Sequence, residues 1–281
     1  RILARPGAEF AFPAEIVTGR LADENALAHL AEGAALVVHA AGLIKARRPA
    51  DFLPVNLHGA RRMAAAAARQ APDARFVLVS SLSAREPQLS AYAASKAAGE
   101  SEVRAILASD RLTIVRPPAI YGPGDRETLA LFKAIASLPA LPSPGPAHAR
   151  LALIHVADAA AAIATLAERP AAGGVFALAD GQPEGYGWLQ IVQTAAGALG
   201  RAAPPILPTP ALAILALGAA GSLLGRIGPA RIMTLGKARE VLHGDWSVRP
   251  EELAPGLAPP RFDLAAGFAD SVAWYRASGW L

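Results

Sequence analysis

The stretch Ser90-Ala91-Tyr92-Ala93-Ala94-Ser95-Lys96-Ala97-Ala98-Gly99-Glu100 decides how this chain is interpreted. It lies in a run of good helix formers, so Tyr92 and Lys96, four residues apart, are expected on one face of a helix. An ammonium beside a phenol favours the phenolate, and such a pair is suited to proton transfer at neutral pH. The same spacing also arises by chance on exposed helices. The motifs around the pair therefore have to decide between the two interpretations.

Outward from this stretch, apolar β-type runs alternate with alanine-rich helical runs. This alternation is typical of a parallel sheet with helices on both faces. We expect an α/β fold, a Rossmann-like doubly wound parallel sheet, with a smaller, mostly helical C-terminal region. The expected division is 1–183 for the sheet domain, of which 119–150 contributes to a substrate cleft, and 184–281 for the substrate-binding region.

The element boundaries follow from caps, turn residues and apolar periodicity. The expected strands are 1–5, 14–18, 35–42, 75–79, 112–116, 151–155 and 174–178. The expected helices are 23–32, 56–71, 91–107, 128–137, 158–168, 188–199, 210–224, 237–242 and 264–280, and the residues from Ile120 to Asp125 are expected as a turn-rich loop.

Composition excludes several classes of protein. With 281 residues, 53% of them hydrophobic and 18% charged, the chain is not a disordered protein. The net charge is only +4 and no basic block reaches five residues, so no nucleic-acid partner is expected. The absence of cysteine excludes disulfides, cysteine-ligated zinc and a thiol nucleophile, and it fits a cytoplasmic location.

One segment is relevant to the question of membrane association. The longest apolar run extends from Pro210 to Leu224 and is interrupted by Gly218 and Gly221. It is shorter than the roughly 20 residues that a membrane span requires. We expect a buried or interfacial helix and no transmembrane span, which leaves peripheral membrane contact open.

Polar residues follow three of the expected strands. They are His39-Ala40-Ala41-Gly42, Ser80-Ser81 and Arg116-Pro117-Pro118. Ligands of open parallel sheets bind at the carboxyl ends of the strands, so Ser81, Tyr92 and Lys96 are expected to converge there. A strand-end cap is the alternative role for the two serines.

These motifs, in this order, resemble the short-chain dehydrogenase/reductase superfamily and, within it, the extended, epimerase/dehydratase-like branch. The matching residues are Val38-His39-Ala40-Ala41-Gly42, Val79-Ser80-Ser81, Tyr92-x-x-x-Lys96-x-x-x-Glu100, Arg116-Pro117-x-x-x-Tyr121-Gly122-Pro123-Gly124-Asp125, Ile154-His155-Val156-x-Asp158 and Gly267-x-x-x-Ser271-Val272-x-Trp274-Tyr275-Arg276.

The resemblance implies a role for each matching residue. Tyr92 would be the catalytic acid/base, Lys96 would bind the nicotinamide ribose, and Ser81 would orient the substrate's carbonyl or hydroxyl group. Residues 1–183 would then form an NAD(P)-binding domain. The cofactor would be lined by His39, Ala40, Ala41, Gly42 and Pro117 in addition to Tyr92 and Lys96.

The family's glycine-rich turn, G-x-x-G-x-x-G, does not occur in this sequence. The chain starts at what corresponds to the family's second strand. We therefore expect the native protein to carry an additional N-terminal segment of about 25–30 residues that supplies the first strand and this turn.

Two arginines bear on the choice of cofactor. Arg5 stands at the end of the second family strand, where NAD-preferring members carry an acid, and Arg20 replaces the acid in Thr18-Gly19-Arg20-Leu21. A guanidinium suits a 2′-phosphate, so NADP is expected, with NAD remaining open and with Arg5 and Leu21 at the cofactor. A solvated strand end is the alternative for Arg5.

Other polar residues carry weaker signals. His39 is either a core histidine or a cofactor-lining one, and Asn56 either assists a proton relay or caps a helix. His155 and Asp158 are three residues apart, but two ligands without a third do not make a metal site, so no metal is expected.

The expected function is that of an NAD(P)-dependent oxidoreductase or epimerase acting on a hydroxyl/carbonyl group. Hydride would pass between nicotinamide and substrate while Tyr92 moves the proton. The apolar run at 210–224 favours a hydrophobic small-molecule substrate, and a nucleotide sugar is the alternative. A non-catalytic NADP-binding member that serves a membrane complex or its assembly is a further alternative. By analogy with the family, a homodimer would form through the Tyr92 helix and the helix at 56–71.

Overall fold

The computed structural model describes residues 1–8, 10, 12–169, 173–227 and 233–281. The chain divides into two compact units that interleave along the sequence. The first comprises Arg1–Val115, Leu166–Val175 and Gly225–Arg231, and the second comprises Arg116–Thr165, Phe176–Leu224 and Ile232–Leu281. The sequence predicts one boundary at residue 183 instead, and that boundary stays a prediction.

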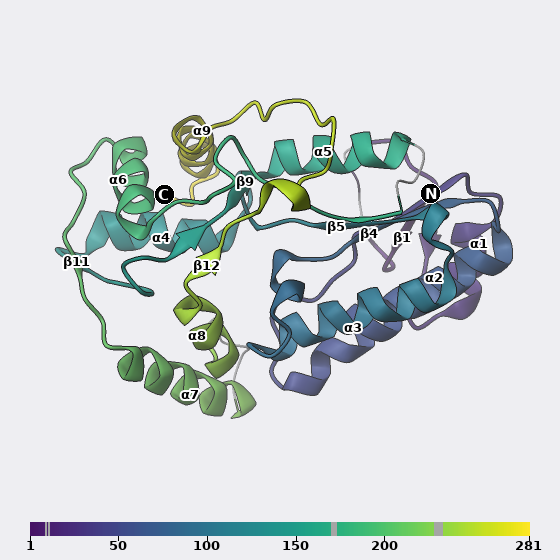
Figure 1. The fold of residues 1–281 in the computed structure, drawn as a ribbon, viewed down its shortest axis with the longest axis horizontal. Coiled ribbons are helices and arrows are strands. Elements are labelled where there is room, and N and C mark those ends of the chain that lie inside the picture. Colours follow the sequence, from purple (N-terminus) through teal and green to yellow (C-terminus); the bar gives the residue numbers. More distant parts are fainter. Residues whose placement is uncertain (9, 11, 170–172, 228–232) are drawn as a thin grey trace. The chain divides into compact units, whose positions relative to one another are not determined.

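Parallel strands form the framework of the first unit (Figure 1). A two-stranded sheet pairs β1 (Ile2–Ala4) with β2 (Ile16–Thr18) in parallel. A four-stranded sheet has the order β10-β5-β4-β3, formed by β3 (Leu36–His39), β4 (Arg75–Val79), β5 (Leu112–Arg116) and β10 (Val175–Ala177). The pairs β3–β4 and β4–β5 are parallel, so the expected α/β fold with a parallel sheet is confirmed.

Helices connect these strands. The helices are α1 (Glu24–Ala31), α2 (His58–Gln70) and α3 (Ala91–Ile106). α1 begins at the predicted cap, because the Asp23 side chain accepts a hydrogen bond from the Ala26 amide. α2 and α3 lie side by side (Figure 1), and Gly99 of α3 allows a close approach to the residues just before α2. A Cβ at Gly99 would lie 2.3 Å from the Asn56 carbonyl oxygen.

Among the segments that differ from the sequence prediction are the start of α2 and the stretch after β5. The helix expected from Asn56 begins at His58, because a 3-10 helix η1 (Pro49–Phe52) and a π-helical turn η2 (Leu53–Leu57) precede it. The loop expected from Ile120 starts with a strand, β6 (Ala119–Tyr121), which pairs with β9 (Leu153–His155). Two prolines end β5, and backbone pairing resumes immediately after them with a different partner.

The second unit is built from short parallel strand pairs and helices around an aromatic core. Besides β6–β9, β7 (Leu141–Pro142) pairs with β11 (Ile206–Leu207), and β8 (Arg150–Leu151) pairs with β12 (Asp245–Trp246). The helices are α4 (Arg126–Ser137), α5 (Val156–Glu168), α6 (Trp188–Leu199), α7 (Ala211–Ile227), α8 (Leu235–Leu242) and α9 (Leu264–Ala277).

The core of this unit lies between α4, α6 and α9. Phe132 and Phe268 meet edge to face at 5.3 Å between ring centroids, and Tyr121 meets Phe268 at 5.1 Å. Edge-to-face aromatic pairs contribute beyond the area that they bury, so these rings fix how the three helices pack.

No helix within the described ranges is both long and apolar enough to cross a membrane.

Candidate active site

His39 is the last residue of β3 and is buried, with 5% of its surface exposed. Burial, and secondly the charge of Lys96, lower the pKa of His39 from 6.5 to about 4. Its Nε2 atom is also buried and has no hydrogen-bond partner. Buried polar atoms of this kind are uncommon in proteins, so Nε2 has the capacity to take up a hydrogen bond from a bound group.

The loop after β3 is held against α3 by one side chain. Asn56 Oδ1 accepts a hydrogen bond from the Leu43 amide at 2.7 Å, and Asn56 Nδ2 donates to the Leu43 carbonyl at 2.9 Å and to Ser95 Oγ at 2.9 Å. A Cβ at Gly42 would lie 3.6 Å from Lys96 Nζ and 3.7 Å from Asn56 Oδ1. The backbone at Gly42 therefore runs directly past the lysine ammonium.

Lys96 lies on α3 and is buried. Its Nζ donates a 2.8 Å hydrogen bond to the carbonyl of Val79, the last residue of β4. Burial lowers the pKa of Lys96 from 10.5 to about 8, and the charge of Glu100 opposes this shift. The structure thus brings the lysine to the carboxyl end of β4, as the sequence predicts.

Glu100 is a buried carboxylate one turn beyond Lys96. Its Oε1 accepts a 2.5 Å hydrogen bond from Ser80 Oγ, and its Oε2 lies 3.6 Å from the Arg104 guanidinium. The Ser80 hydroxyl therefore links the end of β4 to α3.

Tyr92 lies in the first turn of α3, four residues before Lys96. It is half-buried, and its ring centroid lies 5.9 Å from that of Phe52. Its carbonyl accepts a 2.7 Å hydrogen bond from Ser95 Oγ, the same hydroxyl that Asn56 contacts. The pair Tyr92–Lys96 thus has the helical spacing that the sequence predicts, and its catalytic role stays a prediction.

Ser81 caps a short 3-10 helix, η3 (Leu82–Arg85). Its Oγ accepts a hydrogen bond from the Ser83 amide at 3.2 Å, which matches the strand-end cap that the sequence left open. A hydroxyl that accepts one bond still has its proton to donate. Capping therefore leaves the predicted role of Ser81 at the substrate as a prediction.

The other residues predicted to contact the cofactor differ in burial and lie in both units. Arg5 follows β1 and is exposed, as are Ala40 and Ala41 after β3. The Leu21 side chain packs on α2, since a Cβ at Gly59 would lie 2.8 Å from its Cδ1. Pro117 is buried and belongs to the second unit. Their contacts with a cofactor remain predictions.

His155 and Asp158 have separate partners. His155 Nε2 lies 3.3 Å from an Asp270 oxygen, whereas Asp158 accepts hydrogen bonds from Arg261 and from the Phe262 amide. Within the described residues, no group of three or more histidine, aspartate or glutamate side chains is arranged to hold a metal ion.

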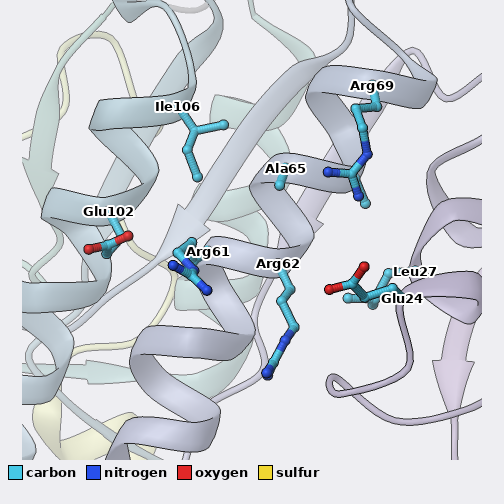
Figure 2. Close-up of a pocket in the computed structure, with 9 residues that line it drawn as sticks. Glu24, Leu27, Arg61, Arg62, Ala65, Arg69, Glu102 and Ile106 are labelled. Carbon is cyan, nitrogen blue, oxygen red and sulfur yellow. The ribbon is translucent and has the colours of Figure 1, made fainter.

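A groove of mixed charge lies between α1, α2 and α3 (Figure 2). Arg61, Arg62 and Arg69 of α2 line it together with Glu24 and Glu102. None of the residues predicted for catalysis or cofactor binding is among its lining residues. The homodimer expected from the sequence would use this α2–α3 side of the unit.

The structure thus combines a parallel sheet, a buried lysine at the end of one strand, a tyrosine one helical turn before that lysine, and a glycine loop that passes the ammonium. The model of the NAD dependent epimerase/dehydratase family matches residues 3–179, and the chain belongs to this family. A ceramide reductase of Caulobacter vibrioides (strain NA1000 / CB15N) is 48% identical over 268 residues, which are 95% of this chain and 82% of the relative.

Solved structures share the fold. The protein gox2253 matches with a TM-score of 0.75 and 21% identity over 100% of this chain and 91% of its own. The human epimerase family protein SDR39U1 (isoform 2) with NADPH has a TM-score of 0.69 and 19% identity over 96% of this chain and 90% of its own. MoeE5 with UDP-glucuronic acid and NAD has a TM-score of 0.66 and 21% identity over 98% of this chain and 90% of its own. The expected Rossmann-like fold is confirmed.

The sequence left Asn56 open between a proton relay and a helix cap, and it did not predict the hydrogen bond between Ser80 and Glu100. The contacts of Asn56 with the loop after β3 could not be foreseen, because both backbone groups that it bonds belong to Leu43, 13 residues earlier. The signal for Glu100 was present, because it follows Lys96 by the same four-residue step that separates Lys96 from Tyr92.

Proposed function

We propose that this protein is an NADP-dependent reductase that converts a ketone of a ceramide-like lipid to the secondary alcohol, with Tyr92 as the proton donor. The observation that carries the proposal is the placement of Tyr92 one helical turn before a buried Lys96 at the carboxyl end of β4. The 48% identity to a protein named ceramide reductase supports the choice of substrate.

The residues around Lys96 fit the ribose–nicotinamide half of a dinucleotide. Gly42 leaves room above the ammonium, and His39 Nε2 has no protein partner. Lys96 would bind the ribose hydroxyls, and the loop from His39 to Gly42 would lie along the ribose and pyrophosphate. NADPH, when bound, supplies the hydride that reduces the carbonyl carbon. The exposed Arg5 supports NADP over NAD, because a guanidinium suits the additional phosphate.

Three side chains of the protein, Ser81, Tyr92 and Lys96, would carry out the proton transfer to the substrate oxygen. Ser81 Oγ–H would hydrogen-bond the substrate carbonyl oxygen and hold it beside the Tyr92 hydroxyl. Tyr92 would donate its proton to the oxygen as negative charge develops there, and the resulting phenolate would regain a proton from solvent. The Lys96 ammonium stabilises that phenolate electrostatically.

The test compares the native full-length protein with its Tyr92→Phe variant. Activity is followed as NADPH oxidation with a keto-ceramide in detergent micelles, and NADPH affinity is measured by fluorescence titration. We expect NADPH to bind with unchanged affinity and turnover to fall by at least about a hundredfold, the usual scale of lost general acid catalysis.

The matched control is Tyr121→Phe, which removes a hydroxyl that makes only a 3.4 Å hydrogen bond to the Asp263 carbonyl. This control should retain activity. Full activity of Tyr92→Phe would contradict the catalytic assignment. Turnover of a nucleotide sugar in place of the keto-ceramide would contradict the substrate class.

A further inference from the structure

Helix α7 (Ala211–Ile227) exposes an unusually apolar face. Its residues from 211 to 225 include no charged side chain. Leu212 is 80% exposed, Leu217 60%, Leu223 65% and Leu224 47%. Every exposed residue between Ala211 and Leu224 is an alanine or a leucine. Exposed apolar surface that is contiguous in this way marks an interaction site.

The opposite face of α7 fixes the direction in which the leucines point. Gly218 and Gly221 pack against α8 and the residues before it, since a Cβ at Gly218 would lie 2.7 Å from the Ala238 Cβ and one at Gly221 would lie 1.9 Å from the Met233 carbonyl oxygen. Ser222 Oγ accepts a 2.8 Å hydrogen bond from the Leu235 amide. Figure 1 shows α8 beside α7. The helix therefore cannot rotate to bury its leucines without losing this packing.

The sequence from the start of α6 to the middle of α8 carries only basic charges, and the first acidic residue after it, Glu240, is buried and lies 3.2 Å from Lys237. From residue 185 to residue 239 there is no aspartate or glutamate, whereas the same stretch contains Arg201, Arg226, Arg231, Lys237 and Arg239. Of these, Arg201, Lys237 and Arg239 are exposed within the described residues. An apolar helix in a purely basic segment is complementary to a surface that is both apolar and anionic.

We propose that α7 docks this protein on the surface of a bilayer that contains anionic phospholipid. The helix lies in the plane of the membrane, with Leu212, Leu217, Leu223 and Leu224 below the headgroups and the exposed Lys237 and Arg239 of the adjoining helix α8 near the lipid phosphates. At 17 residues the helix is about 25 Å long, which is too short to span the hydrocarbon core but sufficient for an interfacial helix.

A bilayer fits this face better than a protein partner does. Specific protein interfaces are enriched in tyrosine, tryptophan and arginine at their centres, and they satisfy polar groups around them. The exposed face of α7 offers alanine and leucine only, which give affinity for hydrocarbon without directional contacts. The inference extends the proposed function, because a ceramide-like substrate resides in the same bilayer, but it is carried by α7 and its charge environment alone.

The experiment is flotation of the native full-length protein with vesicles of phosphatidylcholine, with and without phosphatidylglycerol. We expect wild type to float with the anionic vesicles and the combined variant Leu212→Gln, Leu217→Gln and Leu223→Gln to float at least about tenfold less. Raising the salt concentration should weaken wild-type binding, since part of the attraction is electrostatic. The matched control is Leu189→Gln on α6, a leucine that is 60% exposed outside α7, and it should float as wild type does.

A second variant keeps the test decisive if the combined variant folds poorly. Leu212→Trp should show a blue-shifted emission with anionic vesicles and quenching by brominated lipid, because position 212 enters the acyl region. The proposal is overturned if wild type does not float, if the combined variant floats as well as wild type, or if vesicles leave the emission of the Leu212→Trp variant unchanged. Flotation does not depend on turnover, so loss of the proposed reductase activity with retained flotation would refute the reaction and leave the docking surface intact.

Discussion

His39 and Lys96 are basic side chains that lie beside the loop at Gly42, and both have pKa values below their usual ones. Burial disfavours a charge on His39 and on Lys96, and the positive charge of Lys96 additionally disfavours a proton on His39. At neutral pH His39 is therefore neutral, and its Nε2 can donate or accept a hydrogen bond according to the tautomer.

The first residue-scale prediction concerns stability in acid. The unfolded chain protonates His39 near pH 6.5, whereas the folded chain resists protonation until about pH 4. Acidification through this window therefore favours the unfolded state, by an upper limit of about 3 kcal/mol for this one group. His39→Gln should lose less stability than wild type between pH 7 and pH 4, which urea unfolding at a series of pH values would measure.

The control for this prediction is His29→Gln, which changes an exposed histidine on α1. Because this imidazole is exposed, its replacement should leave in place the acid-induced loss of stability that is attributed to the burial of His39. If the His39→Gln curve also parallels wild type throughout, then burial of a neutral His39 is not a source of acid sensitivity.

At this scale the sequence predicted the pair Tyr92–Lys96 because the spacing is local and helical. It could not predict the clamp by Asn56, because that side chain's partners come from the loop after β3 and from α3, 13 and 39 residues away. The resemblance assigns the substrate role to Ser81 and not to Ser80, but the sequence did not predict that Ser80 bonds Glu100. Which of the two adjacent serines bonds Glu100 and which caps η3 depends on the direction of each side chain at the end of the strand.

At the scale of elements, the contact of α3 with η2 and α2 depends on the absence of one side chain. Alanine is about 1 kcal/mol more favourable than glycine inside a helix, so propensity alone favours Gly99→Ala. The new Cβ would however lie 2.3 Å from the Asn56 carbonyl oxygen, which is backbone and cannot move alone.

We expect Gly99→Ala to destabilise the protein by about 1–3 kcal/mol, the usual range for overpacking. The matched substitution is Gly197→Ala on α6, where a Cβ would meet nothing within 4 Å, and it should stabilise by up to about 1 kcal/mol. Thermal unfolding of both variants gives the two signs. A stabilised Gly99→Ala would mean that α3 and η2 do not approach as closely as described.

Helix and strand positions were largely predictable, since caps and apolar runs mark them locally. Asp23 and Ser90 begin α1 and α3 as N-caps, and β4 and β5 have the predicted bounds. The π-helical turn at Leu53–Leu57 and the strand Ala119–Tyr121 were not predicted. Both depend on partners distant in sequence, α3 for the former and β9 for the latter.

At the scale of the whole chain, the second unit depends on its last helix. The buried Tyr275 of α9 donates hydrogen bonds to the carbonyls of Gly122 at 3.2 Å and Asp125 at 2.6 Å, about 150 residues earlier in the sequence. Its ring stacks on Trp280 with 6.0 Å between centroids. Trp274, Tyr275 and Trp280 therefore join the end of the chain to the core of the second unit.

Tyr275→Phe keeps the ring and removes both hydrogen bonds, so we expect a loss of about 1–3 kcal/mol in the free energy of unfolding. Urea unfolding should show Tyr121→Phe to be the milder variant, because its hydroxyl makes a single, longer bond. Equal stability of wild type and Tyr275→Phe would indicate that packing of the ring alone anchors α9.

Helix α3, which carries Tyr92 and Lys96, extends from the candidate active site to the protein surface. Tyr92, Lys96, Glu100 and Arg104 occupy successive turns of α3, and the Arg104 side chain is 46% exposed, whereas Glu100 is buried. Glu100 raises the proton affinity of Lys96, and Arg104 faces Glu100 from the surface. The buried carboxylate that favours the charged form of Lys96 is thus itself paired with a cation at the protein surface. Variation at residue 104 would therefore change the charges around the buried carboxylate while leaving Tyr92 and Lys96 unaltered.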